Sequence, residues 1–176
     1  MRIARVAIAA ALAILAAQAP GDRPVVLHPV MKNVVAPQAN ILWDVGNRAM
    51  DDDGKADASK IKPADWTGLA AASTAMKNAA LQLANAPKVI IAGSGDTLQD
   101  GDAPGASTAA QMQSYIDADP KAFAAHAREL ADVSEEFLQA ATARDAAKLT
   151  AASGRLDEVC ESCHSRFWYP QQKPAN

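Results

Sequence analysis

Apolar residues recur every three or four positions in four stretches of this chain, which is the period of an amphipathic α-helix. The stretches cover residues 29–45, 63–83, 119–141 and 145–169. The clearest stripe, in the second stretch, is made by Trp66, Leu69, Ala72, Met76, Ala80 and Leu83. The pattern therefore predicts four principal helices.

Local signals mark the ends of these helices. Asp119 followed by Pro120 is typical of a helix start, because aspartate caps the first amides and proline suits the first helical position. Asp145 can cap the fourth helix, which should end before Pro170. Pro37 lies inside the first stretch and should kink or divide that helix, because proline lacks the amide hydrogen and clashes with the preceding turn.

Two connections lack a helical period. Residues 51–62 are polar, and residues 86–119 are interrupted by glycine and proline, although residues 107–116 predict a short helix. A connection as long as the second is unusual in a compact bundle, and its role is open.

Composition favours helices over strands. The chain has 176 residues, of which 49% are hydrophobic and only 5% aromatic, and alanine is abundant. We expect one all-α domain over residues 20–176. The formal net charge of -3, without a run of basic residues, argues against nucleic-acid binding. No carboxylate pair, activated nucleophile or phosphate loop stands out, so we do not expect an enzyme.

The first residues are typical of a secretory signal peptide. Arg2 and Arg5 precede an apolar run over residues 6–17, which is too short to span a bilayer. The pattern predicts a signal peptide over residues 1–19, a mature form without a membrane span, and a periplasmic location. Ala17 and Ala19 offer a cleavage pattern, but Pro20 disfavours it, so the exact site is open, as is an uncleaved anchor.

The strongest motif is Cys160-Glu161-Ser162-Cys163-His164, the C-x-x-C-H spacing of covalent c-type haem attachment. Cys160 and Cys163 can each form a thioether with a haem vinyl group, and His164 can reach the iron from the proximal side. The alternatives are a chance match, a thioredoxin-like redox pair and structural zinc. The chain shows no strand before the motif and no paired histidines, so we predict one covalently bound haem c.

This arrangement resembles the class II cytochromes c, the cytochrome c-prime and c-556 family, in which the haem motif lies near the end of the last helix. The residues Met31-Lys32, Ile41-Leu42-Trp43-Asp44, Asp65-Trp66 and the ending Phe167-Trp168-Tyr169-Pro170 are similar to a c-556-like bacterial branch. The resemblance implies an antiparallel four-helix bundle with haem attached on the C-terminal helix. Members often carry arginine where this chain has Trp168, so no role of that arginine carries over.

The resemblance also implies a sixth iron ligand. In c-556-like proteins a methionine early in the first helix supplies it, and Met31 is at that position. Methionine is also a common core filler, so packing is the alternative. His28, one turn earlier, can compete for iron, although an exposed histidine is the ordinary outcome there, and His126 is expected at the surface or bundle edge. The other internal methionines, with no better case, are Met50, Met76 and Met112.

Several other side chains are candidates for contact with the haem. Lys32 and Arg166 can neutralise haem propionates, and the acidic residues 51–53 can dock a basic redox partner, but solvated charge explains each equally well. Core packing is likewise the alternative for the candidate wall residues Trp43, Trp66, Phe123, Phe137, Phe167 and Trp168.

Histidine with methionine suits electron transfer, whereas an open site admits gases. We therefore expect an exported monohaem cytochrome that carries single electrons between redox partner proteins. The first alternative is a five-coordinate cytochrome c-prime that binds NO or CO, and relatives of that kind often form homodimers. The second is a haem-free helical interaction module.

Overall fold

The structure is a computed structural model that describes residues 23–98 and 106–170. The predicted signal peptide, residues 1–19, lies outside the described residues. The described residues are mostly helical and include all four predicted helices. Their α and π helices are α1 (Leu27–Val30), η1 (Met31–Val35), α2 (Ala36–Arg48), α3 (Pro63–Ala84), α4 (Ala109–Ala118), α5 (Pro120–Ala143) and α6 (Ala146–Phe167).

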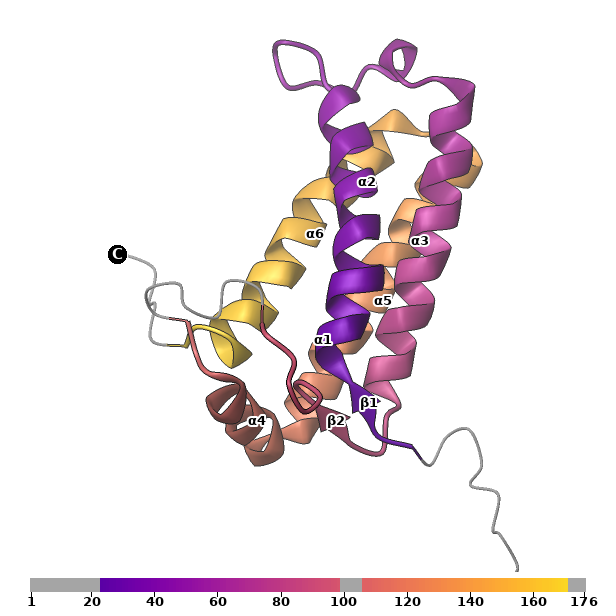
Figure 1. The fold of residues 1–176 in the computed structure, drawn as a ribbon. Coiled ribbons are helices and arrows are strands. Elements are labelled where there is room, and N and C mark those ends of the chain that lie inside the picture. The colour runs from indigo at the N-terminus through magenta and orange to yellow at the C-terminus, as the bar shows by residue number, and fades with distance from the viewer. Residues whose placement is uncertain (1–22, 99–105, 171–176) are drawn as a thin grey trace, which may run out of the picture.

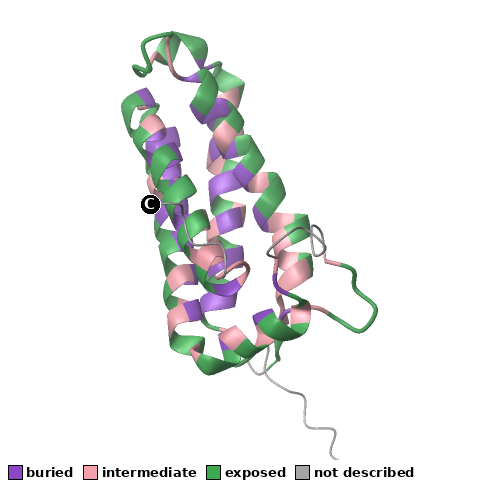
Figure 2. Ribbon diagram, turned by 90° about the vertical axis from the view of Figure 1, so that its left-hand side faces the viewer, coloured by how far each residue is buried: buried purple, intermediate pink, exposed green. Residues whose placement is uncertain are grey.

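The long helices lie side by side along the molecule (Figure 1). Helix α3 packs against α5, α5 against α6, and α2 against both α3 and α6. Their inward faces carry the buried residues (Figure 2), as the helical period predicts. The largest fully buried apolar side chains are Phe137, Leu42, Leu69, Met76, Leu149, Leu156 and Val133. The architecture is compatible with an all-α bundle.

Pro37 changes the type of the first helix and does not end it. Helices α1, η1 and α2 follow one another without a break from Leu27 to Arg48, and the π-helical segment Met31–Val35 directly precedes Pro37 on the second residue of α2. Proline cannot donate to the carbonyl four residues earlier and crowds it, and a wider turn relieves that clash. Of the two predicted outcomes, a kink or a division, the division does not occur; the helix continues through a π-helical segment that begins at Met31.

The predicted helix caps are confirmed. The carboxylate of Asp119 accepts a hydrogen bond from the amide of Ala122 at 3.0 Å, and that of Asp145 accepts one from the amide of Lys148 at 3.0 Å. These bonds satisfy amides that a helix start otherwise leaves unpaired.

Within residues 23–98 and 106–170, no helix has the length and apolar character needed to span a bilayer.

The described parts of the long connection, residues 86–98 and 106–119, are more ordered than the sequence predicts. The expected short helix is present as α4, and two strands of two residues each, β1 (Val25–Val26) and β2 (Val89–Ile90), pair in parallel. The side chain of Gln113 on α4 accepts from the amide of Ile91 at 2.9 Å and donates to the carbonyl of Val89 at 3.0 Å. Residues 89–91 of the connection are thus held between the N-terminal segment and α4.

Candidate functional site

A cavity of about 330 Å³ lies between the first helix and the last. Residues of α1, η1 and α2 line one part of it and residues of α6 another. The long connection, α4, α5 and Leu83 of α3 complete the wall. Most lining side chains are apolar, among them Val35, Ile91, Leu98, Ile116, Leu130 and Val159. An apolar macrocycle can therefore be buried here with little loss of polar hydration.

All three residues of the predicted haem motif line this cavity. Cys160, Cys163 and His164 follow one another at the i, i+3 and i+4 positions of α6. In an α-helix this spacing places side chains on one face. The helix therefore presents two thiols and an imidazole to the same apolar space.

Burial keeps these three groups uncharged. It raises the pKa of the Cys160 thiol to about 11 and that of the Cys163 thiol to about 12. It lowers the pKa of His164, and the carboxylate of Glu161 opposes that effect only in part. Neutral imidazole is the form that coordinates iron. The donor set thus fits a covalently held haem, with two thiols for the vinyl groups and one imidazole for the metal.

A metal ion held by protein side chains alone is a different kind of site. In the part of the chain that the structure describes, no three or more His, Cys, Asp or Glu side chains gather closely enough to hold one. The zinc alternative for the motif therefore has no ligand cluster among those residues.

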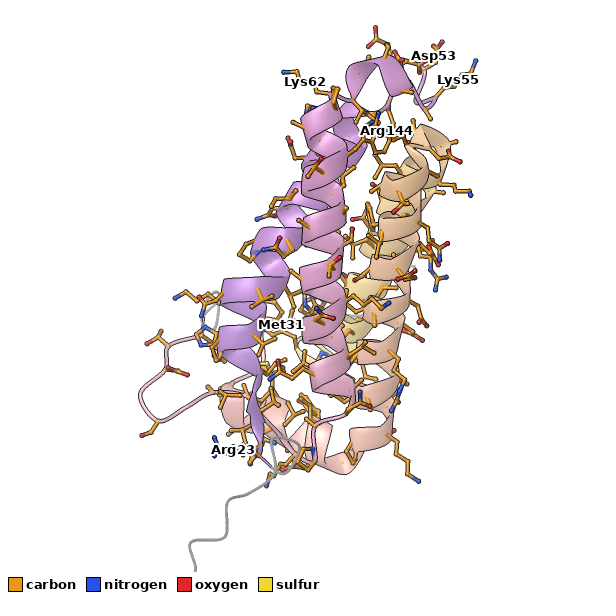
Figure 3. All side chains as sticks on the ribbon, turned by 90° about the vertical axis from the view of Figure 1, so that its right-hand side faces the viewer. Arg23, Met31, Asp53, Lys55, Lys62 and Arg144 are labelled. Carbon is orange, nitrogen blue, oxygen red and sulfur yellow. The ribbon has the colours of Figure 1, made fainter. Side chains whose placement is uncertain are left out.

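The structure brings Met31 to the same cavity. It is half-buried on η1, at the N-terminal part of the first helix (Figure 3), and lines the space that the motif also lines. Met31 and His164 thus share one cavity although they lie near opposite ends of the chain. Met76 is buried in the core and Met50 forms an isolated bridge with Ala56, and neither lines the cavity.

A family model described as Cytochrome C' matches residues 98–168, which include α4, α5 and the haem motif. This segment matches the cytochrome c-prime family. The resemblance to the class II cytochromes c is confirmed over these residues, and this family implies the binding of haem c. Neither the curated proteins nor the solved structures gave a match.

Apart from Lys32, three further polar or sulfur side chains line the cavity, namely those of His28, Met112 and His126. His28 lies there with its Nδ1 3.8 Å from Asp96. Its Nε2 is buried and finds no hydrogen-bond partner among the described residues. Met112 reaches the cavity from α4, so it is a second methionine in the wall.

The third is His126 on α5, predicted at the surface or the bundle edge, which is half-buried at that edge and lines the cavity. Its Nδ1 lies 3.1 Å from Glu129, and its ring packs edge-on to Phe167, with centroids 5.9 Å apart. The helical period places this residue at the edge of the buried face, and the ring of Phe167 on α6 packs against it there.

Three of the six aromatic residues that are candidates for the haem wall lie at the cavity. Phe123, Phe167 and Trp168 line the cavity. Trp66 and Phe137 are buried in the core and Trp43 packs against it, so for these three the alternative of core packing holds. Helical period indicates which face of a helix is buried, but not the level along the bundle at which a residue lies.

The charged residues proposed to contact haem or a redox partner also differ in whether they lie at the cavity. Lys32 is exposed and lines the cavity, whereas Arg166 forms an ion pair with Asp119, with the two charged atoms 2.7 Å apart. The acidic loop of residues 51–53 lies at the far end of the molecule from Met31 (Figure 3). Of these charges, only Lys32 is at the cavity.

The main feature that sequence reasoning missed is the contribution of the long connection. Ile91, Leu98, Met112 and Ile116 all come from it and close one side of the cavity. No periodicity signalled this, because the segment reaches the cavity through the β1–β2 pairing and through α4.

Proposed function

We propose that this chain is an exported, periplasmic c-type cytochrome that carries single electrons through one covalently bound haem c. Cys160 and Cys163 are its attachment residues, His164 the proximal iron ligand and Met31 the distal ligand. One observation carries the proposal. Met31 lines the same apolar cavity as the haem motif, on an N-terminal helix far from the motif in the sequence.

The chain's residues contribute attachment, coordination and exclusion of water. Each thiol would add its sulfur and its hydrogen across one vinyl group of the haem, so attachment would need no oxidant. The neutral imidazole of His164 and the thioether of Met31 supply one nitrogen and one sulfur donor, a pair that favours electron transfer. The bound haem supplies the one-electron chemistry, and the protein tunes it through ligation and burial.

The surrounding helices form the scaffold in this proposal. We take residues 20–176 as one antiparallel four-helix bundle, with α6 carrying the haem and the first helix facing its other side. The apolar lining of the cavity keeps the iron in a medium of low polarity. No catalytic role is assigned, and electrons pass to and from partner proteins. Lys32, exposed at the cavity, can neutralise a haem carboxylate.

The first test is whether haem remains with the denatured chain. A pyridine haemochrome assay after denaturation detects covalent haem, and its absence would reject the cytochrome assignment in favour of a haem-free module. The stoichiometry of iron to protein should be one.

The second test distinguishes electron transfer from gas binding. Reduced protein with methionine ligation should show sharp low-spin α and β bands, and Met31→Ala should abolish them. Met112→Ala is the matched control, since Met112 is the other methionine in the cavity wall. A high-spin spectrum that changes with added CO and ignores Met31→Ala would instead assign the five-coordinate, gas-binding alternative.

A further inference from the structure

The last turn of α6 folds two aromatic side chains back onto His164. The amides of Trp168 and Tyr169 both donate to the carbonyl of His164, at 2.8 Å and 3.0 Å. The rings of His164 and Trp168 meet edge to face, with centroids 4.9 Å apart and planes at 84°. The ring of Tyr169 is also edge-on to His164, at 6.1 Å and 65°. Such edge-on contacts are favourable and directional, so they restrict rotation of the imidazole.

Two bonds hold this aromatic pair in place. The hydroxyl of Tyr169 donates to the carboxylate of Glu161 at 2.6 Å. Glu161 lies on α6 one turn before His164, so this bond fixes Tyr169, which follows the helix, against α6. The amide of Ser107, just before α4, donates to the carbonyl of Trp168 at 3.0 Å. A hydrogen bond to an ionised oxygen is stronger than one between neutral groups. We therefore expect the bond between Tyr169 and Glu161 to be stronger than the backbone bond between Ser107 and Trp168.

Glu161 also brings charge to the proximal side. Residues three apart on a helix are neighbours, with Cβ atoms about 5–6 Å apart, so its carboxylate is near the imidazole of His164. A negative charge close to an iron ligand favours the more positive, oxidised metal. Glu158 lies one turn further from His164 on the same helix and makes no hydrogen bond or ion pair among the described residues.

We propose that Glu161 and Tyr169 are positioning residues for the proximal imidazole. Their hydrogen bond holds the Trp168–Tyr169 pair edge-on to His164 and keeps a carboxylate beside it, which fixes the orientation of the ring and stabilises oxidised iron. This role rests on the proposed function, because it requires His164 to coordinate haem iron.

The test uses two variants and two matched controls in the holoprotein. Glu161→Gln removes the charge but keeps an oxygen that accepts from Tyr169, and Glu158→Gln is its control. Tyr169→Phe removes only the hydroxyl, and Tyr115→Phe is its control, since the described residues offer the Tyr115 hydroxyl no hydrogen bond. The readouts are the midpoint potential and the g values of the ferric protein in electron paramagnetic resonance.

The proposal expects a higher potential in Glu161→Gln than in Glu158→Gln. It also expects altered g values and a raised potential in Tyr169→Phe but not in Tyr115→Phe. The double variant Tyr169→Phe/Glu161→Gln should raise the potential by less than the sum of the single shifts, because the two residues act through one bond.

Potentials and g values equal to those of the two controls would overturn the positioning role. A pyridine haemochrome assay on the same samples separates this failure from failure of the proposed function. If haem is covalently bound and the potentials are unchanged, only the positioning role of Glu161 and Tyr169 is rejected. If the chain carries no covalent haem, the positioning role and the proposed function are both rejected.

Discussion

Gly46 on α2 packs directly on Ser153 on α6. A methyl group at Gly46 would overlap the hydroxyl of Ser153 and lie 3.1 Å from its Cβ, which is tighter than ordinary packing. Ser153 is buried, and its hydroxyl has no hydrogen-bond partner among the described residues. A glycine at this point allows α2 and α6 to approach closely, and the haem motif lies further along the same α6.

Gly46→Ala should therefore destabilise the protein by about 1–3 kcal/mol, the usual cost of overpacking a close contact. Urea unfolding of the holoprotein measures it. Gly68→Ala on α3 is the matched control, because no atom lies within 4 Å of the added methyl group there. That change should stabilise the helix by about 0.5–1 kcal/mol. Adding Ser153→Ala to Gly46→Ala should recover part of the loss, and equal effects at the two glycines would contradict the close contact.

Gln113 is expected to hold the long connection in place. Gln113→Ala leaves the amide of Ile91 and the carbonyl of Val89 without their side-chain partners, at a cost of about 1–3 kcal/mol for each buried group left unpaired. Hydrogen exchange should speed up at the amide of Ile91. Gln139→Ala on the exposed face of α5 should change neither quantity. Unchanged protection of Ile91 would show that the β1–β2 pairing alone holds this segment.

Much of the fold could be predicted because its signals are local. The caps at Asp119 and Asp145 depend on residues three positions away, and the buried stripe of α3 depends on helical period alone. Pro37 also gave a correct local signal of disturbance. A break and a π-helical segment relieve the same clash, however, and packing of both flanking segments on the rest of the protein favours the continuous helix.

The cavity wall could be predicted only in part, because it depends on contacts between distant segments. The attachment motif is contiguous, so its residues were evident from spacing. The neighbours contributed by the connection, Ile91 and Met112, reach the cavity only after β1 pairs with β2 and α4 packs against α6. Strands of two residues carry no periodicity that a sequence could reveal.

The contribution of each attachment cysteine should be detectable by visible spectroscopy. Cys160→Ser and Cys163→Ser should each keep haem bound through one thioether, because the other thiol still lines the cavity. One vinyl group then stays conjugated with the ring, so the α band of the pyridine haemochrome should move to longer wavelength. The double variant should lose its haem to acidic acetone. Ser162→Ala, between the two cysteines, is the control and should leave the band in place; two unshifted single variants would contradict covalent attachment.

An ion-pair network at the start of α3 predicts a pH-dependent stability. Arg48 on α2 donates to Asp65 at 3.3 Å and to Asp44 at 3.1 Å, and the amide of Lys62 donates to Asp65 at 2.8 Å. The hydrogen bond from Arg48, followed by that from Lys62, lowers the pKa of Asp65. Folding then favours the ionised carboxylate, so this stabilisation is fully present above the unfolded-state pKa of about 3.9 and is lost as the pH falls through the lower folded-state pKa.

Asp65→Asn should accordingly destabilise the protein at pH 7 by at most about 1 kcal/mol, since the network lies near the surface. The difference in unfolding free energy between the two proteins should shrink as the pH is lowered below 4, where wild-type Asp65 also becomes protonated. Urea unfolding of both proteins across that pH range measures the difference. Acid destabilisation that is common to the two proteins cancels in it. Asp132→Asn is the control, because Asp132 is exposed and forms no ion pair among the described residues. If the difference in unfolding free energy stayed constant with pH, the charge of Asp65 would not contribute to stability. The effect of the substitution would then come from the uncharged interactions of this side chain at the start of α3.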